Sequence, residues 1–294
     1  MRAIFIGSVK ISERCLKKLI ELEVNIVGVF GSSKPERNAD YCDLSGISKI
    51  YDLNFMAVDD LNVPAMIASI RELNPDVIFC IGWSRILGSE LLQIPKYGVI
   101  GYHPSALPKN RGRHPIIWAL ALGLKSTAST FFIMNAGVDS GDIISQKKIA
   151  INALDDAQSL YKKIINSALI QLKEIITKMR LGKLNPIIQD EQFASYWRKR
   201  NYADGQIDWR MSADSIYNLV RALAEPYCGA HAIVRGCEVK INSAAVVKTN
   251  DNVSEPGKVL KKSKNKLVIK CGHGAISIDS KLFSTFNLNV GDYL

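Results

Sequence analysis

The sequence predicts an α/β fold: a large first domain built on a doubly wound sheet, followed by a small β-rich, barrel-like domain. Up to about residue 180, short apolar runs alternate with helical patterns, as in such sheets. After residue 211, short apolar runs recur at close spacing between turn residues, as in small β barrels and sandwiches. We therefore expect a large α/β domain over 1–190, a linker over 191–210 and a small β domain over 211–294.

Composition and charge limit the classes of function. The 294 residues are 47% hydrophobic and 22% charged, enough for one large core and one small core. The net charge of +10 favours acidic ligands such as nucleic acid, a nucleotide sugar or a polyglutamylated folate. The six cysteines form no CxxC pair and no apolar run approaches 18 residues. We expect a cytoplasmic protein without disulfides, metal site, signal peptide or membrane span.

The first third of the chain alternates strands and helices. We expect strands over 2–7 and 25–30 on either side of a helix, then a helix over 63–73 and a strand over 77–81. The GSVKISE run after the first strand lacks the glycine spacing of a dinucleotide site. Ligands of open α/β sheets lie beyond the carboxyl ends of strands, so the loop after the strand at 77–81 should border a cleft.

The rest of the chain gives a second set of expected elements. Residues 126–134 and 143–151 should form an antiparallel pair, and a helix over 157–180 should bury an apolar stripe. Residues 196–209 combine aromatic and charged side chains, which we interpret as a domain junction rather than a ligand site. Strands then follow over 232–234, 239–247, 257–260, 266–271 and 274–278. The lysine-rich hairpin among them is interpreted as a solvated surface.

Residues 101–146 carry most of the chemistry. His103 lies in the rigid turn HPSALP, and Asp139 lies in the glycine-flanked turn GVDSGD. A carboxylate brought close to an imidazole orients the ring and favours its charged form, which suits proton transfer at a nucleophilic amine. Arg111-Gly112-Arg113 adds two cations suited to phosphate or carboxylate. Each piece alone is ordinary, but the order and spacing together predict an active site.

These motifs resemble those of the formyltransferases that use 10-formyltetrahydrofolate. The family signature is His-x-Ser-x-Leu-Pro, an Arg-Gly pair, and a distal Asp followed by a small residue and Gly. Matching residues run in register from Pro75 to Gln146, with a weaker likeness from Met1 onward and again over 198–209. The resemblance implies a Rossmann-like formyltransferase domain with a mixed sheet, in which His103 is the general acid/base and Asp139 orients it.

The resemblance also implies binding residues. The acceptor would contact Ser105 and Arg113, and the chemistry needs no metal. The pteridine of 10-formyltetrahydrofolate would be held by two loops: Arg85, Ile86 and Leu87 in the first, and Asn135, Ala136, Gly137, Val138 and Asp139 in the second.

One position departs from the family. The usual Asn two residues before the His, a donor to the oxyanion, is Gly101 here. Loss of one oxyanion donor costs about 3 kcal/mol of transition-state stabilisation. Either a backbone N–H, a water or another side chain such as Asn110 or Asn135 replaces it, or activity is weak.

The resemblance leaves the acceptor open. RGRHPIIW is similar to the RGRxPxxW of the nucleotide-sugar formyltransferases, which implies the amine of a nucleotide-linked aminosugar, such as a 4-amino-4,6-dideoxyhexose for surface polysaccharide (lipopolysaccharide) biosynthesis. Residues 31–55 carry three cations and four carboxylates, which argues against tRNA. The alternatives are a methionyl-tRNA formyltransferase, a formyltetrahydrofolate hydrolase and a non-catalytic folate- or nucleotide-binding protein. Neither a nucleic-acid nor a membrane partner is favoured, and a homodimer stays open.

Overall fold

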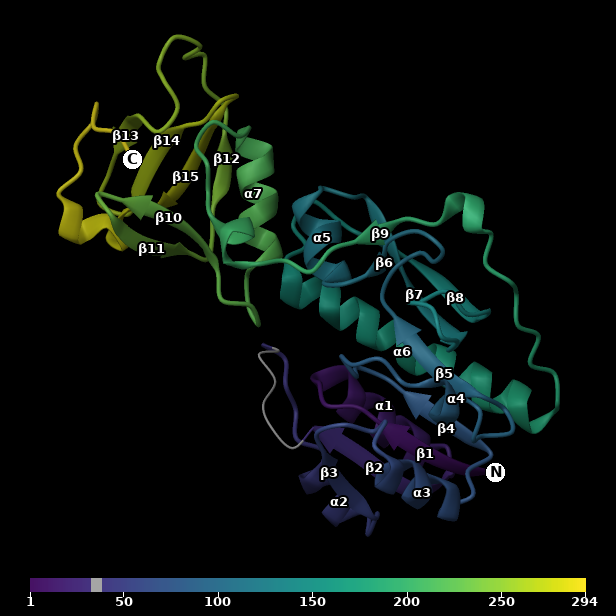
Figure 1. Cartoon of the computed structure of the whole chain (residues 1–294). Coiled ribbons are helices and arrows are strands. Elements are labelled where there is room, and N and C mark those ends of the chain that lie inside the picture. The colour runs from purple at the N-terminus through teal and green to yellow at the C-terminus, as the bar shows by residue number, and fades with distance from the viewer. Residues whose placement is uncertain (33–38) are drawn as a thin grey trace. The chain divides into compact units, whose positions relative to one another are not determined.

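The computed structural model describes residues 1–32 and 39–294, which form two compact units (Figure 1). The first unit contains Met1–Pro115, Thr127–Ile149 and Lys162–Trp197. The second contains Ile116–Ser126, Ala150–Tyr161 and Arg198–Leu294. Residues 191–197 of the expected linker thus belong to the first unit and 198–210 to the second. That separately folding domains end at residue 190 and begin after residue 210 stays a prediction.

A seven-stranded mixed sheet forms the centre of the first unit, which confirms the predicted α/β class (Figure 1). Its strand order is β3-β2-β1-β4-β5-β7-β8. The first five strands in this order are parallel, and β7 runs antiparallel to β5. The strands are β1 (Arg2–Ile6), β2 (Asn25–Ser32), β3 (Phe55–Val58), β4 (Val77–Cys80), β5 (Val99–His103), β7 (Ser126–Ile133) and β8 (Ile143–Ala150).

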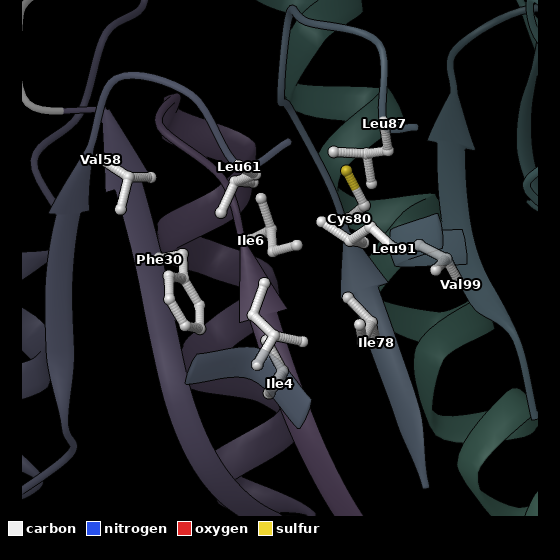
Figure 2. Packing of buried hydrophobic residues seen from close by; sticks show 11 residues of the cluster. Ile4, Ile6, Phe30, Val58, Leu61, Ile78, Cys80, Leu87, Leu91 and Val99 are labelled. Carbon is white, nitrogen blue, oxygen red and sulfur yellow. The ribbon is translucent and has the colours of Figure 1, made fainter. Parts of the chain in front are cut away.

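The apolar runs of β1 and β4 are buried on both faces of the sheet. Successive strand residues point to opposite faces, so alternate residues of β1 and β4 join a single cluster on one face (Figure 2). Helices α3 (Pro64–Glu72) and α4 (Ser89–Leu92) contribute to this cluster. The intervening residues Phe5 and Phe79 are also fully buried. Strands buried on both faces read as continuous apolar runs, which is why the sequence located them.

The remaining helices of the first unit follow the predicted pattern. Helix α1 (Lys10–Glu21) buries an apolar stripe, and α2 (Ser45–Ile50) is a short helix between β2 and β3. Helix α6 (Ala157–Arg180) has the predicted bounds. Its Gln171 amide donates to the Ser129 carbonyl of β7 and to the Ser145 hydroxyl of β8. These two hydrogen bonds fix α6 against the antiparallel end of the sheet.

The second unit is β-rich. Strands β10 (Ala230–Val234) and β11 (Cys237–Ile241) form a hairpin. A four-stranded antiparallel sheet has the order β12-β15-β14-β13. Its strands are β12 (Ala245–Val247), β13 (Val259–Lys262), β14 (Lys266–Lys270) and β15 (Ala275–Asp279). The helices of this part are α5 (Pro115–Ala121), α7 (Ala213–Ala222) and the 3-10 helices η2 (Tyr202–Gly205) and η3 (Ser280–Phe286).

One expected strand, 239–247, is wrong because it is two strands in different sheets. Strand β11 ends at Ile241 and pairs with β10, whereas β12 begins at Ala245 and pairs with β15. Asn242 and Ser243 lie between them, and both residue types favour turns. The chain therefore changes sheets at a break that the apolar pattern of 239–247 does not reveal.

The aromatic and charged stretch after Trp197 is structural within the second unit. Arg198 donates to both carboxylate oxygens of Asp204, at 2.7 and 2.5 Å. The Trp118 indole N–H donates to the Arg198 carbonyl at 3.0 Å, and the Arg200 guanidinium lies 4.7 Å from the Trp118 ring centroid. The hydrogen bonds from Arg198 lower the pKa of Asp204 to about 2. These side chains contact one another within the second unit, and the interpretation of 196–209 as a domain junction stays a prediction.

The charged residues Lys34, Glu36 and Arg37 of the 31–55 stretch lie outside the described residues. Over the parts of the chain that are described, no helix is long and apolar enough to span a membrane.

Candidate active site

His103 and Asp139, 36 residues apart in the chain, lie together in the first unit. His103 is the last residue of β5 and is 5% exposed. Its Nδ1 lies 3.5 Å from Asp139 Oδ2, and its Nε2 lies 2.9 Å from the carbonyl oxygen of Asn110. Both neighbours are acceptors, so both ring nitrogens can donate together only when the imidazole is protonated. A cationic imidazole at this position therefore has two oxygen acceptors, the Asp139 carboxylate and the Asn110 carbonyl.

The backbone around Asp139 is constrained. Asp139 has φ of +51°, in the left-handed region that side chains other than glycine seldom adopt. Its Oδ2 accepts a hydrogen bond of 2.8 Å from the backbone N–H of Gly112. Gly112 has φ of +102°, and a Cβ there would lie 2.4 Å from the Trp197 carbonyl oxygen. Only glycine lets the chain approach Trp197 so closely and still present its N–H to the carboxylate.

Arg111 is a structural cation, and its predicted role with phosphate or carboxylate ligands is wrong. The side chain is fully buried. Its five N–H donors bind the Gln189 amide oxygen twice, both oxygens of Glu191, and the Tyr196 hydroxyl, at 2.7 to 3.2 Å. Hydrogen bonds from Arg111 lower the pKa of Glu191, and the same bonds raise the pKa of Arg111. No N–H remains for a ligand.

The partners of Arg111 belong to residues 189–197, which we call the strap. The two-residue strand β9 (Tyr196–Trp197) in the strap pairs in parallel with β6 (Arg111–Gly112). Ser195 Oγ accepts from the Asn110 backbone N–H at 2.9 Å, and the Ser195 carbonyl accepts from the Arg111 N–H at 2.9 Å. The strap therefore supports the loop whose Asn110 carbonyl contacts His103. Residues 189–195 show no periodic pattern, so the sequence predicted only a linker from residue 191 and gave no sign that this segment contacts Arg111.

Arg113, unlike Arg111, is partly exposed. Its guanidinium donates to the Ser84 carbonyl at 2.8 Å, which links it to the loop after β4. In that loop Arg85 and Ile86 are exposed, whereas the Leu87 side chain is 2% exposed and joins the core cluster (Figure 2). Because the Leu87 side chain is buried, a ligand could contact this residue only through its backbone.

The second predicted folate loop is open to solvent. Residues Asn135, Ala136, Gly137 and Val138 are all exposed. Asn135 Oδ1 accepts from the Gly137 N–H at 3.0 Å and the Ser140 hydroxyl at 2.8 Å, so the loop closes on itself. Among the hydrogen bonds of the described residues, none uses Asn135 Nδ2, which makes this amide a candidate replacement for the oxyanion donor.

Ser105 and Gly101 are both enclosed by the protein. Ser105 is fully buried and its hydroxyl donates to the Lys109 carbonyl at 3.0 Å, so it stabilises the turn instead of facing a ligand as predicted. A Cβ on Gly101 would lie 2.7 Å from Met134 Cγ and 2.9 Å from Phe132 Cζ. The neighbours of Gly101 therefore occupy the space that an asparagine would need.

Residues 1–32 and 39–294 contain no group of three or more His, Cys, Asp or Glu side chains that could hold a metal ion. The groups that meet at this site are an imidazole, a carboxylate and backbone groups, which can transfer a proton to and from a bound reactant.

Comparison with known proteins identifies the family. Residues 1–176 match the Formyl transferase family model, and residues 199–283 match the model of the Formyl transferase C-terminal domain. A methionyl-tRNA formyltransferase of Caldanaerobacter subterraneus subsp. tengcongensis is 35% identical over 283 residues, which is 95% of this chain and 91% of that protein.

Solved structures agree at the level of fold. The sugar 3N-formyl transferase WlaRD has a TM-score of 0.72 at 18% identity, covering 95% of this chain and 97% of that one. An N-formyltransferase from Helicobacter canadensis has a TM-score of 0.70 at 18% identity, covering 94% and 98%. The two family models, which match residues 1–176 and 199–283, define the class as group-transfer enzymes. The chain belongs to the formyltransferase family.

Proposed function

We propose that this enzyme moves the formyl group of 10-formyltetrahydrofolate to a primary amine, with His103 as general acid/base. The observation that carries the proposal is the imidazole of His103 between the Asp139 carboxylate and the Asn110 carbonyl. The neutral amine attacks the formyl carbon, and the bond from that carbon to N10 breaks. The proton lost by the amine passes to N10 through His103 Nε2, which exchanges its hydrogen bond with the Asn110 carbonyl for one with the reactant, and Asp139 at Nδ1 stabilises the cationic ring in between.

The two loops beside this pair suit the folate. The first, 82–87, follows the carboxyl end of β4, where ligands of such sheets bind. The second, 135–138, presents the half-exposed Val138 side chain, and Ile86 in the first is 71% exposed. Apolar side chains open to solvent are suited to the faces of a pteridine, and backbone groups of both loops are suited to its edges.

Methionyl-tRNA is the first candidate for the acceptor. It is supported by the 35% identity to a methionyl-tRNA formyltransferase over nearly the full length of both chains. The net charge of +10 is compatible with a polyanionic substrate. The similarity to sugar formyltransferases, at 18% identity, concerns the fold alone.

A nucleotide-linked aminosugar is the second candidate, and particular residues favour it. Arg113 keeps a partly exposed guanidinium beside the site and follows the fully engaged Arg111. A guanidinium is suited to bidentate binding of a diphosphate. The 31–55 stretch, with its excess of carboxylates, provides little attraction for tRNA.

The test is a mass-spectrometric assay of formyl transfer from 10-formyltetrahydrofolate to a panel of acceptors. The panel contains initiator methionyl-tRNA, UDP-, dTDP- and GDP-linked aminosugars, and water alone. We expect one acceptor to gain a formyl group and His103→Ala to abolish the gain. The exposed His273 provides a matched control, since His273→Ala should retain activity.

The outcomes separate the candidates. Formylated methionyl-tRNA selects the first candidate and a formylated sugar the second, with Arg113→Ala then raising the KM for the sugar. Formate released in water alone identifies a hydrolase. Folate binding without turnover on any acceptor rejects the proposal and identifies a non-catalytic binding protein.

A further inference from the structure

Gln189, the first residue of the strap, uses every polar atom of its amide at the active site. The side chain is 5% exposed. Its Nε2 donates to the carbonyl oxygens of Asp139 at 2.8 Å and Gly141 at 2.6 Å. Its Oε1 accepts from Arg111 Nε at 3.2 Å and from Arg111 Nη2 at 2.8 Å. A buried primary amide with both donors and its acceptor satisfied has a fixed orientation.

The turn that Gln189 binds needs such support. Asp139 adopts the left-handed conformation, which costs about 1 kcal/mol or more for a residue with a Cβ and persists only where surrounding contacts enforce it. A Cβ on Gly141 would lie 1.6 Å from the Ile133 carbonyl oxygen, so the turn is also tightly packed. Gln189 holds its two carbonyls, and the Gly112 N–H holds the Asp139 carboxylate.

We propose that Gln189 is a positioning residue that holds the Asp139 carboxylate within reach of His103. Arg111 orients the Gln189 amide, and the amide fixes the turn that carries Asp139. Gln189 contacts neither His103 nor the reacting atoms, so its effect passes through Asp139. The catalytic part of this inference rests on the proposed function, whereas the positioning part concerns the geometry of the His103 ring.

The Gln189→Glu substitution removes the N–H donors of the amide and keeps an oxygen acceptor. The new carboxylate still accepts from Arg111 but turns an oxygen toward the carbonyls of Asp139 and Gly141, where no hydrogen bond can form. The exposed Gln192, on the same strap, provides the matched control Gln192→Glu with the same change of charge. Both variants are studied as full chains, and equal thermal midpoints show that neither has unfolded.

Two readouts separate positioning from a general structural role. The first is steady-state kinetics, in which Gln189→Glu should lower kcat on the order of 10- to 100-fold with little change in either KM, because a misplaced catalytic group affects the transition state. The second is the ¹⁵N spectrum of the imidazole rings at one pH. The chain has four histidines, and His103→Ala assigns the His103 signal, which should shift in Gln189→Glu and stay unchanged in Gln192→Glu.

The combined results distinguish this inference from the proposed function. Unchanged kcat and an unchanged His103 signal in Gln189→Glu overturn the positioning role. A shifted His103 signal in a chain whose wild type formylates no acceptor upholds the positioning and rejects the function. A fall in kcat with an unmoved His103 signal also overturns the inference, since the loss then arises elsewhere.

Discussion

A side chain introduced at Gly101 should destabilise the first unit, which tests why the family asparagine is absent. In Gly101→Ala the added methyl would lie 2.7 Å from Met134 Cγ and 2.9 and 3.1 Å from two ring carbons of Phe132. Contacts under 3.0 Å force neighbours to move. Met134 is flexible, but the Phe132 ring is 3% exposed and has little room. Overpacking of this kind costs about 1 to 3 kcal/mol.

Thermal unfolding followed by circular dichroism measures this cost. For a chain of this size, each kcal/mol corresponds to a fall in Tm of roughly 2 to 4 °C, so Gly101→Ala should melt several degrees below the wild type. Gly46→Ala is the matched control, because a Cβ at Gly46 in α2 meets no atom within 4 Å. Alanine there should stabilise the helix by roughly 0.5 to 1 kcal/mol.

The result that would refute this reasoning is a Gly101→Ala Tm equal to or above that of the wild type. The pocket around Gly101 would then have room for a side chain. In that case Gly101→Asn should be tested for a gain in formyl transfer, since the asparagine could restore an oxyanion donor worth about 3 kcal/mol in the transition state. If Gly101→Ala is destabilised, the donor must come from elsewhere, and Asn135→Ala should lower kcat.

Three further predictions concern charge and burial. Because the folded pKa of Asp204 is about 2 and its ordinary value is near 3.9, its contribution to stability is present above pH 4 and lost as the pH falls toward 2; the difference in urea stability between wild type and Asp204→Asn should disappear over that interval. Arg111→Lys should cost about 1 to 3 kcal/mol in urea unfolding, because it leaves the buried Gln189 oxygen without its donors; an unchanged midpoint would contradict the network described above. A thiol reagent should modify the exposed Cys228 and Cys237 within the native state, whereas the three buried thiols should react only on unfolding; early reaction of a buried thiol would show that its core opens locally.

Burial also lowers the reactivity of two of the buried thiols, Cys80 and Cys271. Burial raises the pKa of Cys80 to about 12 and that of Cys271 to about 11. The thiolate is the reactive form, so at neutral pH these two groups are almost wholly unreactive even where a reagent reaches them.

Much of the fold could be predicted from the sequence because the signals were local. Strands buried on both faces appear as unbroken apolar runs, and the 24-residue helix α6 repeats its apolar positions at helical spacing. His103 and Asp139 could be proposed because their turns contain proline and glycine in a recognisable order. The distance of 3.5 Å between His103 Nδ1 and Asp139 Oδ2 depends on the tertiary structure, which the motifs alone do not specify.

The supporting residues could not be predicted because their roles depend on distant partners. Arg111 and Gln189 are 78 residues apart, and a stretch without periodicity gives no sign that it pairs with a loop so far away. Two arginines on either side of a glycine look equivalent in the sequence, yet Arg111 is fully buried and Arg113 is partly exposed. The backbone conformation at Gly112, between the two arginines, directs their side chains to these different environments.

The position of the strap late in the first unit has a consequence for the order of events on the ribosome. His103 and Asp139 are both synthesised well before Trp197, the residue that ends the strap and pairs with Gly112. At 5 to 20 residues per second, the stretch between Gly141 and Trp197 takes roughly 3 to 11 seconds to translate. A nascent chain that has completed six strands of the sheet therefore still lacks the strap that supports the loops carrying His103 and Asp139. The proposed active site becomes complete only when the strap, most of which was expected to be a linker, has left the exit tunnel.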